Sequence, residues 1–283
     1  MAGTTTDPVD GLAVVDKAAG WTSHDVVAKA RGILGTRKIG HSGTLDPDAT
    51  GVLLLGVGAA TRLLRYLNDL PKTYTGEVVF GTATSTLDAS GEVTGTWDMD
   101  VTPEAVDAAL PRFVGDIEQV PPMVSAVQVG GKRLHELARE GIEVERAARP
   151  VRVDSFTAEP TDDPLVYRIE VTCSSGTYIR TLAADLGHAL GGGAHLRALR
   201  RTAIGPYTVE VAQPLEQVEL LPVGAAVAHL EHVVVDDETA ALVANGRKLR
   251  FADHDEPVAV LDGAGELLAV YRAGKPDLVL PRR

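Results

Sequence analysis

A glycine-rich stretch, GHSGTLDPDATG at residues 40–51, places three ionisable side chains close together: His41, Asp46 and Asp48. An aspartate before a proline, as at Asp46, commonly starts a turn, and Asp48 could cap the segment that follows it. The same loop could instead present one carboxylate to a substrate. Its composition alone leaves both interpretations open.

Three other segments carry side chains that could take part in chemistry. Lys72 and Tyr74 form a KxY unit, Tyr178 and Arg180 lie in GTYIRTLAADLG, and the basic run HLRALRR spans residues 195–201. Taken singly, each has an ordinary structural interpretation: a half-buried tyrosine, a solvated arginine, or the solvated face of a basic helix or turn. Only their combination can indicate a function.

The sequence disfavours several classes of enzyme. Cys173 is the only cysteine, so neither an intramolecular disulfide nor a cysteine-based zinc site can form. The eight histidines are scattered, and no HExxH pair or carboxylate cluster has the spacing of metal ligands. Neither GxGxxG after a strand nor GxxxxGK(S/T) is present. We therefore expect no metal, and a nucleotide-binding fold has little support.

The charge of the chain is unevenly distributed. Its 283 residues have a formal net charge of -12, which at first disfavours a polyanionic partner. Residues 85–118 hold eight acids against one arginine, but residues 26–65 hold six bases against two acids, and residues 176–207 hold four arginines against one acid. A locally basic face on an acidic protein therefore remains open.

The N-terminal stretch MAGTTTDPVDG has neither the basic start nor the apolar core of a signal peptide. The longest apolar run, GVLLLGVGAA, is about half a membrane span. We therefore expect a cytoplasmic protein without a membrane partner.

Hydrophobic periodicity predicts strands and helices in an irregular order. Helices are expected over residues 22–34, in AATRLLRYLNDL, in EAVDAALPRFVG and in GTYIRTLAADLGHAL. Strands are expected in GLAVVDK, GVLLLGVG, KTYTGEVVFGTAT, RPVRVDSFTAE and LVYRIEVTCSS, and PPMVSAVQVGGKRLHELAREG indicates a strand, a Gly-Gly turn and a helix. This order favours an α+β fold over a doubly wound sheet.

The pattern changes near Gln213-Pro214. The remainder contains VVV, a short helix in DETAALVANG, and the strand-like PVAVLD and LLAVYRA, which together predict a small β-rich domain. Residues 1–10 are short of large apolar groups and are expected to be disordered. We divide the chain into this N-terminus, a main domain over residues 11–215 and a C-terminal domain over residues 216–283.

The four segments, in this order, resemble the TruB family of tRNA pseudouridine synthases, which isomerise a uridine in the T loop of tRNA. The resemblance covers roughly residues 11–210 and includes GLAVVDKAAGWTSHDVV and PPMVSAVQVGGKRLHELAREG. It implies an α+β catalytic domain around a mixed or antiparallel central sheet, followed by a small PUA-like β domain. It also implies that the partner is the T stem-loop of tRNA and that no cofactor is needed.

The resemblance assigns roles to individual residues. Asp46 becomes the catalytic aspartate, Arg180 its ionic partner and Tyr74 the residue that stacks on the target base, while Asp48 has a structural task. His41 helps to fill the place that the flipped uridine leaves. The other substrate-binding residues that it implies are Lys72, Lys132, Arg133, Tyr178, Arg197, Leu199, Arg200 and Arg201.

The chemistry agrees with these roles. Pseudouridine formation breaks the bond between C1′ and N1, turns the base and joins C5 to C1′, without a redox change or a donated group. A carboxylate suffices, by adding to uracil C6 or by supporting C1′, and both routes stay open. Burial beneath the base would raise the pKa of Asp46, and an arginine in contact would oppose that rise. The fixed fork of Arg180 suits a carboxylate better than a lysine would.

Two features depart from the family pattern. Gln128 stands where many relatives have a lysine, which puts a phosphate contact there in doubt. The segment after about residue 215 holds six acids before its first base, Arg247.

Two other functions remain open. The first is a catalytically silent tRNA-binding protein or folding chaperone, against which the complete set of Asp46, Tyr74 and Arg180 argues. The second is a subunit that needs a guide RNA and protein partners, and the lack of long basic extensions argues weakly against it. We expect a monomer without an obligatory protein partner.

Overall fold

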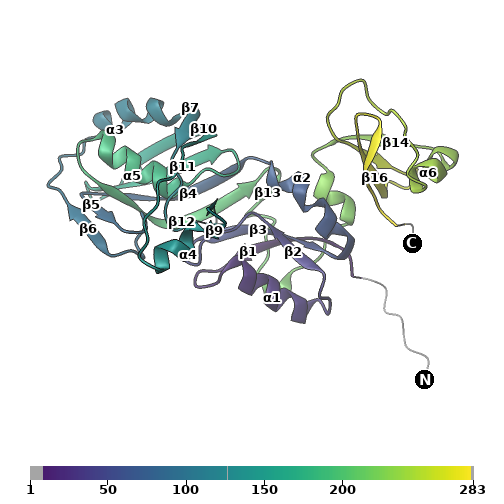
Figure 1. Ribbon diagram of the computed structural model, residues 1–283, viewed down its shortest axis with the longest axis horizontal. Coiled ribbons are helices and arrows are strands. Elements are labelled where there is room, and N and C mark those ends of the chain that lie inside the picture. Colours follow the sequence, from purple (N-terminus) through teal and green to yellow (C-terminus); the bar gives the residue numbers. More distant parts are fainter. Residues whose placement is uncertain (1–8, 126, 282–283) are drawn as a thin grey trace. The chain divides into compact units, whose positions relative to one another are not determined.

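A computed structural model describes residues 9–125 and 127–281, which form two compact units (Figure 1). Unit 1 combines Met1–Pro47, Gly51–Asp69 and Gly205–Arg283, and unit 2 combines Asp48–Thr50 with Leu70–Ile204. The disorder expected for residues 1–10 falls mostly on residues 1–8, which lie outside the described residues. The domain boundary expected at residue 215 stays a prediction.

Unit 1 is built around three antiparallel strands and one helix. Strands β1 (Gly11–Lys17) and β2 (Ile39–Ser42) both pair with β3 (Thr50–Val57), and α1 (Ser23–Ile33) covers them. The expected helix over residues 22–34 is confirmed. Its start is fixed by a capping box, in which Thr22 Oγ1 accepts from the N–H of Asp25 and the Asp25 carboxylate accepts from the N–H of Thr22.

The apolar face of α1 packs onto these strands. Val26, Val27 and Ala30 share a buried cluster with Ala13 of β1 and Leu53 of β3. Burying such side chains stabilises the fold by roughly 1.5–3 kcal/mol for each large one. The helix expected next, in AATRLLRYLNDL, is divided into a 3-10 turn, η1 (Gly58–Leu63), and a short α2 (Leu64–Asn68).

Unit 2 contains five antiparallel strands in the order β12-β4-β11-β10-β7. Their bounds are β4 (Lys72–Phe80), β7 (Gly115–Gln119), β10 (Arg149–Pro160), β11 (Val166–Cys173) and β12 (Ala194–Ile204). Along β4, every second residue is buried, so one face belongs to the core. Helix α5 (Ile179–Ala189) packs against β12, and most of its residues are buried.

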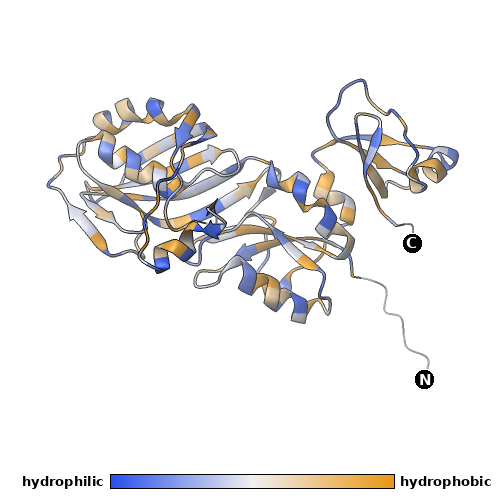
Figure 2. Cartoon of the chain, viewed as in Figure 1, coloured by the Kyte–Doolittle hydropathy of each residue, from blue (hydrophilic) through white to orange (hydrophobic). Residues whose placement is uncertain are grey.

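Smaller elements complete unit 2. They are α3 (Pro103–Ala109), η2 (Leu110–Phe113), α4 (Leu134–Arg139), and the hairpins of β5 (Thr82–Thr84) with β6 (Val93–Thr96) and of β8 (Gln128–Val129) with β9 (Lys132–Arg133). The helices carry both hydrophilic and hydrophobic residues (Figure 2), as expected of elements that cover a core.

The run HLRALRR is a strand, so the expected helix or turn was wrong. It forms most of β12, whose pairing with β4 shifts register between Arg197 and Arg200. Ala198 has a φ of 53° at this bulge. The bulge interrupts the period-2 alternation of side chains that would have identified the strand from sequence.

The C-terminal part of unit 1 is a small β structure, as expected. Strands β14 (Glu231–Val234), β15 (Val258–Leu261), β16 (Leu267–Arg272) and β17 (Lys275–Val279) pair in this order, with β14 and β15 parallel and the others antiparallel. Helix α6 (Asp237–Ala244) packs its Ala240 and Val243 against Tyr271 of β16. The α+β class with a small C-terminal β domain is therefore confirmed.

Two short 3-10 turns, η3 (Leu215–Gln217) and η4 (Val223–Val227), precede this sheet. Strand β13 (Tyr207–Thr208) lies near the start of the last segment of unit 1. Across the part of the chain that the structure describes, no helix is long and apolar enough to cross a membrane.

Candidate active site

The loop that carries Asp46 connects β2 to β3 and is fixed on both sides of this residue. Before it, Ser23 Oγ accepts from the N–H of Leu45 (2.9 Å) and donates to the Leu45 carbonyl (3.3 Å). After it, the carbonyl of Pro47 accepts from the N–H of Gly20 (2.9 Å). Asp46 is half-buried and Asp48 exposed. The loop therefore presents Asp46 on a backbone with little freedom.

A buried lysine reinforces this loop. Lys17 is 1% exposed, and its ammonium donates to the carbonyls of Trp21 (2.7 Å), Pro47 (2.9 Å) and Ala18 (3.0 Å). An ammonium has three N–H donors, which matches these three acceptors. Lys17 thus ties the end of β1 to the residue that follows Asp46. Sequence reasoning missed this role, because a lysine at the end of a strand is usually solvated.

We expect Lys17→Met to lower the free energy of unfolding by about 2–5 kcal/mol, because it removes three hydrogen bonds from a charged donor while keeping the side-chain volume. Chemical denaturation measures the change. The matched control is Lys38→Met at an exposed lysine, for which we expect less than about 0.5 kcal/mol. Equal effects of the two substitutions would contradict the structural role of Lys17.

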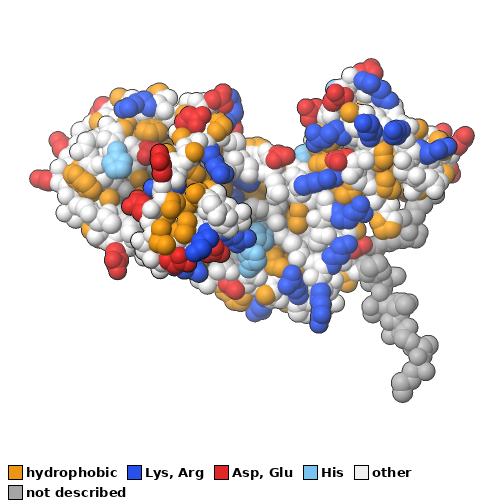
Figure 3. Space-filling model, viewed as in Figure 1, with side chains coloured by type: hydrophobic (Ala, Val, Ile, Leu, Met, Phe, Trp, Pro, Cys, Tyr) orange, Lys and Arg blue, Asp and Glu red, His pale blue; other side chains and the backbone are white. Residues whose placement is uncertain are grey.

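His41 lies on β2, close to the start of the same loop. Its ring meets that of His24, on α1, edge to face, with centroids 5.2 Å apart. His24 is exposed and His41 half-buried. Figure 3 shows a patch of histidine surface in the region of β2 and α1.

In unit 2, Arg180 lies at the start of α5 and is 5% exposed. Its guanidinium donates to the carbonyls of Thr86 (2.9 Å) and Val124 (2.9 Å), and lies 3.4 Å from the Asp88 carboxylate. These contacts fix the plane of the fork. They also counter part of the cost of burying its charge.

Asp88 contacts Arg180, a partner that sequence reasoning missed. Its Oδ1 accepts from Thr86 Oγ1 (2.6 Å), the N–H of Ser90 (3.0 Å) and Ser90 Oγ (2.6 Å), while Oδ2 faces Arg180. In the sequence, Asp88 is one of eight acids in an acidic stretch, and nothing there sets it apart. Hydroxyl residues two positions before and after an aspartate are the one local signal of such a turn.

Tyr178, two residues before Arg180, is held through its backbone. The buried side chain of Gln119, on β7, accepts from the N–H of Tyr178 (2.7 Å) and donates to its carbonyl (3.1 Å). The Gln119 amide thus makes the two hydrogen bonds that a neighbouring β-strand would make with the backbone of Tyr178. It positions the segment from which α5 begins.

We expect Gln119→Leu to leave the N–H of Tyr178 without its partner and to speed hydrogen exchange at this amide by at least about tenfold, since an unsatisfied backbone group costs about 1–3 kcal/mol. Exchange measured by mass spectrometry on peptides of this segment checks it. The control, Gln217→Leu at an exposed glutamine, should leave the exchange rate unchanged.

The buried face of β4 carries Lys72 and Tyr74, which are two residues apart and therefore point the same way. Tyr74 is 9% exposed and is paired in register with Arg201 of β12, which is 1% exposed. Lys72 donates to the carbonyl of Leu70 (2.8 Å). Unit 2 thus brings Lys72, Tyr74 and Arg201 together.

Cys173 lies opposite Lys72 on β11. Burial raises the pKa of its thiol to about 11, so this cysteine stays protonated near neutral pH. A protonated, buried thiol is a poor nucleophile.

The remaining predicted residues lie on more exposed positions. Arg197 pairs with Glu77 across the β12–β4 ladder (2.7 Å), and Arg200 donates to Thr50 Oγ1 (3.4 Å), while Leu199 is half-buried. Lys132, on β9, pairs with Glu140 (3.2 Å), and Arg133 precedes α4. These ion pairs are largely solvated and contribute little to stability, so a phosphate could replace the carboxylates.

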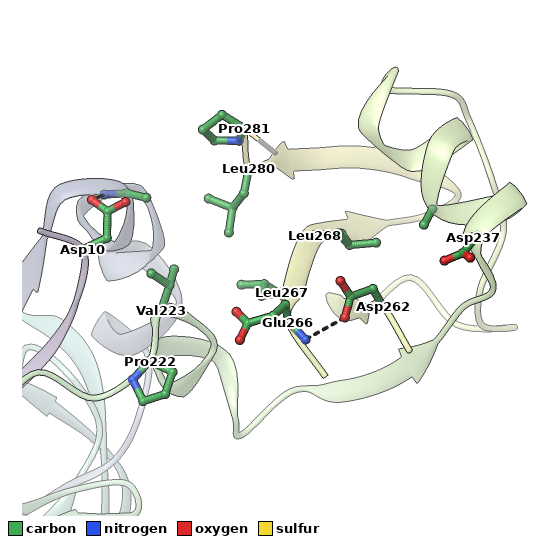
Figure 4. A pocket seen from close by; sticks show the side chains of 12 residues that line it. Asp10, Pro222, Val223, Asp237, Asp262, Glu266, Leu267, Leu268, Leu280 and Pro281 are labelled. Atoms are coloured by element: carbon green, nitrogen blue, oxygen red, sulfur yellow. Dashed lines mark hydrogen bonds between the residues drawn. The ribbon is translucent and has the colours of Figure 1, made fainter. Parts of the chain in front are cut away.

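Unit 1 has a cavity of about 760 Å³ that none of these residues lines (Figure 4). Its wall includes Val223, Leu267 and Leu280, and four carboxylates. The carboxylates belong to Asp10, Asp237, Asp262 and Glu266. Such a lining disfavours a phosphate-bearing ligand.

Among the described residues, no group of three or more His, Cys, Asp or Glu could hold a metal ion.

Comparison with known proteins gives consistent matches along the chain. Residues 31–179 match the family described as TruB family pseudouridylate synthase (N terminal domain). Residues 180–240 match the tRNA pseudouridylate synthase B C-terminal domain, and residues 230–278 match tRNA Pseudouridine synthase II, C terminal.

Individual relatives are similar over nearly the whole chain. A Streptomyces coelicolor protein named tRNA pseudouridine synthase B is 48% identical, covering 94% of each chain. A Mycobacterium tuberculosis protein of the same name is 44% identical, covering 93% of this chain and 91% of the relative. The solved structure "Crystal Structure of a Cbf5-Nop10-Gar1 Complex" is similar with a TM-score of 0.74 at 26% identity, covering 96% of this chain and 85% of that chain.

Proposed function

The chain belongs to the TruB family of pseudouridylate synthases, and from this premise we propose that it isomerises a uridine in the T loop of tRNA to pseudouridine, with Asp46 as the catalytic residue. The relatives that carry the name tRNA pseudouridine synthase B support tRNA as the substrate. The observation that carries the proposal is the clamped loop, because Ser23 and Lys17 fix the residues on either side of Asp46.

A clamped carboxylate suits this reaction. The bond from C1′ to N1 must break while the sugar stays in place, and the base must rejoin through C5. A carboxylate held still near the sugar or the base can add to uracil C6 or support C1′, and needs no cofactor in either case. Its side chain must remain ionised in both routes.

Arg180 keeps Asp46 ionised in the proposed site. Its guanidinium is already buried and oriented by the carbonyls of Thr86 and Val124 and by Asp88. A guanidinium oriented before the substrate arrives costs no rearrangement during the reaction. Asp88 is then a positioning residue that acts through Arg180.

Tyr74 stacks on the flipped uracil, and Tyr178 supports the pocket beneath it. Tyr74 and Lys72 lie on the same face of β4. The ammonium of Lys72 therefore contributes positive charge near the phosphate backbone of the bound nucleotide. Extruding the uridine from the folded loop costs a few kcal/mol. His41, which stands on the edge of the Asp46 loop, occupies the vacated place.

Exposed cations of unit 1 provide a surface for the tRNA backbone. Lys and Arg side chains gather over the C-terminal sheet and over neighbouring segments of the same unit (Figure 3). Their positive charge offsets the negative charge of the six acids that lie from residue 216 to Arg247. Among the described residues of unit 1, the exposed cations are Lys29, Arg31, Arg37, Lys38, Arg62, Arg65, Arg247, Lys248, Arg250, Arg272 and Lys275.

We expect tRNA affinity to fall at least about tenfold between about 50 mM and about 200 mM salt, because each phosphate contact releases counterions. Filter binding at several salt concentrations measures the slope, and circular dichroism at the same concentrations controls for the fold. A flat dependence would mean that the exposed cations are not the docking surface.

The experiment that tests the function uses the purified protein alone. It is incubated with an unmodified tRNA transcript, and pseudouridine is mapped by chemical labelling and primer extension. Product in the T loop is expected, which would also establish that the protein needs no other protein and no guide RNA. Binding without product would favour a tRNA-binding protein or folding chaperone. Product only in the presence of added protein partners would favour a subunit of a larger complex.

A further inference from the structure

Residues 20–24 and residues 41–47 run side by side in unit 1 and are joined at three points. The N–H of Gly20 donates to the carbonyl of Pro47, Ser23 Oγ bonds to the backbone of Leu45, and the His24 ring packs against His41. The two segments are antiparallel, because residues 20, 23 and 24 meet residues 47, 45 and 41 in that order. The first segment therefore forms a rim along the loop that contains Asp46.

This rim exposes an aromatic side chain. Trp21 is 37% exposed although the protein has few aromatic residues, and its carbonyl shares the Lys17 ammonium with that of Pro47. Lys29 Nζ lies 5.4 Å from the centroid of the Trp21 ring and 3.2 Å from Glu216. Aromatic rings accompanied by cations bind single-stranded nucleic acid, because bases stack on the rings and the cations attract the phosphates.

We propose that Trp21 and His24 form a stacking platform for an unpaired base of the RNA, next to the nucleotide that Asp46 modifies. This inference rests on the proposed function and adds a second base contact to it. Unpaired RNA bases are recognised by stacking on aromatic rings, and the indole of Trp21 offers the larger ring. Lys29 reaches the adjoining phosphate by leaving Glu216, since that exposed ion pair is weak.

Tryptophan fluorescence tests the contact directly, because the protein has two tryptophans. In the Trp97→Phe variant, Trp21 is the only one. Saturation with an unmodified tRNA transcript is expected to quench its fluorescence and to lower its acrylamide quenching constant at least about twofold, as stacking covers the ring. Unchanged emission and unchanged acrylamide quenching, while fluorescence anisotropy of labelled tRNA shows full binding, would overturn the proposal.

Two controls make the result specific. The Trp21→Phe variant leaves Trp97, which is 40% exposed and therefore matched in exposure, and its acrylamide quenching is expected to stay unchanged with tRNA. Inorganic polyphosphate offers phosphates without bases, so it should leave Trp21 fluorescence unchanged. Equal protection of both tryptophans, or equal quenching by polyphosphate, would contradict base stacking at Trp21.

Affinity provides an independent measurement. Trp21→Leu should weaken tRNA binding by about tenfold or more, Trp21→Phe should restore most of the affinity, and Trp97→Leu should have no effect. Loss of affinity in Trp97→Leu equal to that in Trp21→Leu would count against the platform. The two hypotheses fail separately: product formation with an unprotected Trp21 removes only the platform, whereas a protected Trp21 without product removes only the proposed reaction.

Discussion

We expect the replacement of Asp46 by Asn to abolish pseudouridine formation and to leave tRNA affinity within about tenfold, or roughly 1.4 kcal/mol. Asparagine keeps the shape of the side chain but has no negative oxygen to add to the base or to support C1′. Binding survives because it depends mainly on phosphate contacts made by cations elsewhere. Single-turnover release of tritium from C5-labelled tRNA measures the reaction, and filter binding measures the affinity.

Asp48 supplies the matched control for this variant. It lies in the same loop, two residues further on, and is exposed. Asp48→Asn is expected to retain most of the activity, because its role is structural. Turnover by Asp46→Asn, or an equal loss in both variants, would refute the assignment of Asp46. Unfolding curves of both variants exclude a trivial loss of the fold.

Arg180→Lys should lower the single-turnover rate at least about a hundredfold while changing tRNA affinity much less. Arg180 uses two nitrogens of one rigid plane to reach the carbonyls of Thr86 and Val124, and a lysine ammonium lacks the planar fork that these bonds orient. The lost orientation lets the pKa of Asp46 rise under the base. The rate of the variant should therefore recover partly as pH increases, whereas that of the wild-type protein should change less.

The Asp88→Asn variant tests whether Arg180 needs the negative charge of Asp88 in addition to its correct orientation. The amide keeps an oxygen for Thr86 and Ser90 but removes the negative charge 3.4 Å from the guanidinium. We expect an intermediate loss of rate with unchanged affinity. The control is Arg152→Lys, at an exposed arginine that pairs with Asp154, which should leave the rate unaltered. An unaltered rate in Arg180→Lys would contradict the proposed ion pair.

Much of the fold follows from local sequence patterns. The capping box of Thr22 and Asp25 and the apolar spacing of Val26, Val27 and Ala30 predict α1, because a helix start and its buried face depend on residues within a few positions of each other. Strands β1, β3, β4, β10 and β11 were predicted for similar reasons. The α+β class then followed from their irregular order.

Two features were hidden from such patterns. Strand β12 was expected as a helix or turn because the bulge near Ala198 breaks its alternation, and only pairing with β4 makes it a strand. Asp88 meets Arg180 across 92 positions of the chain, a contact to which no local spacing points. The resemblance to a known family located Asp46, Tyr74 and Arg180, but it did not identify what holds them.

The sequence by itself determined which residues can do chemistry, the family to which they point, and the main helices and strands, since side-chain type and short-range periodicity are local properties. Only the tertiary structure decided how these residues are held: Lys17 and Ser23 clamp the loop around Asp46, Gln119 holds Tyr178, and Thr86, Val124 and Asp88 orient Arg180. Each of these contacts satisfies a buried polar group, and its partner is set by which distant segments fold together.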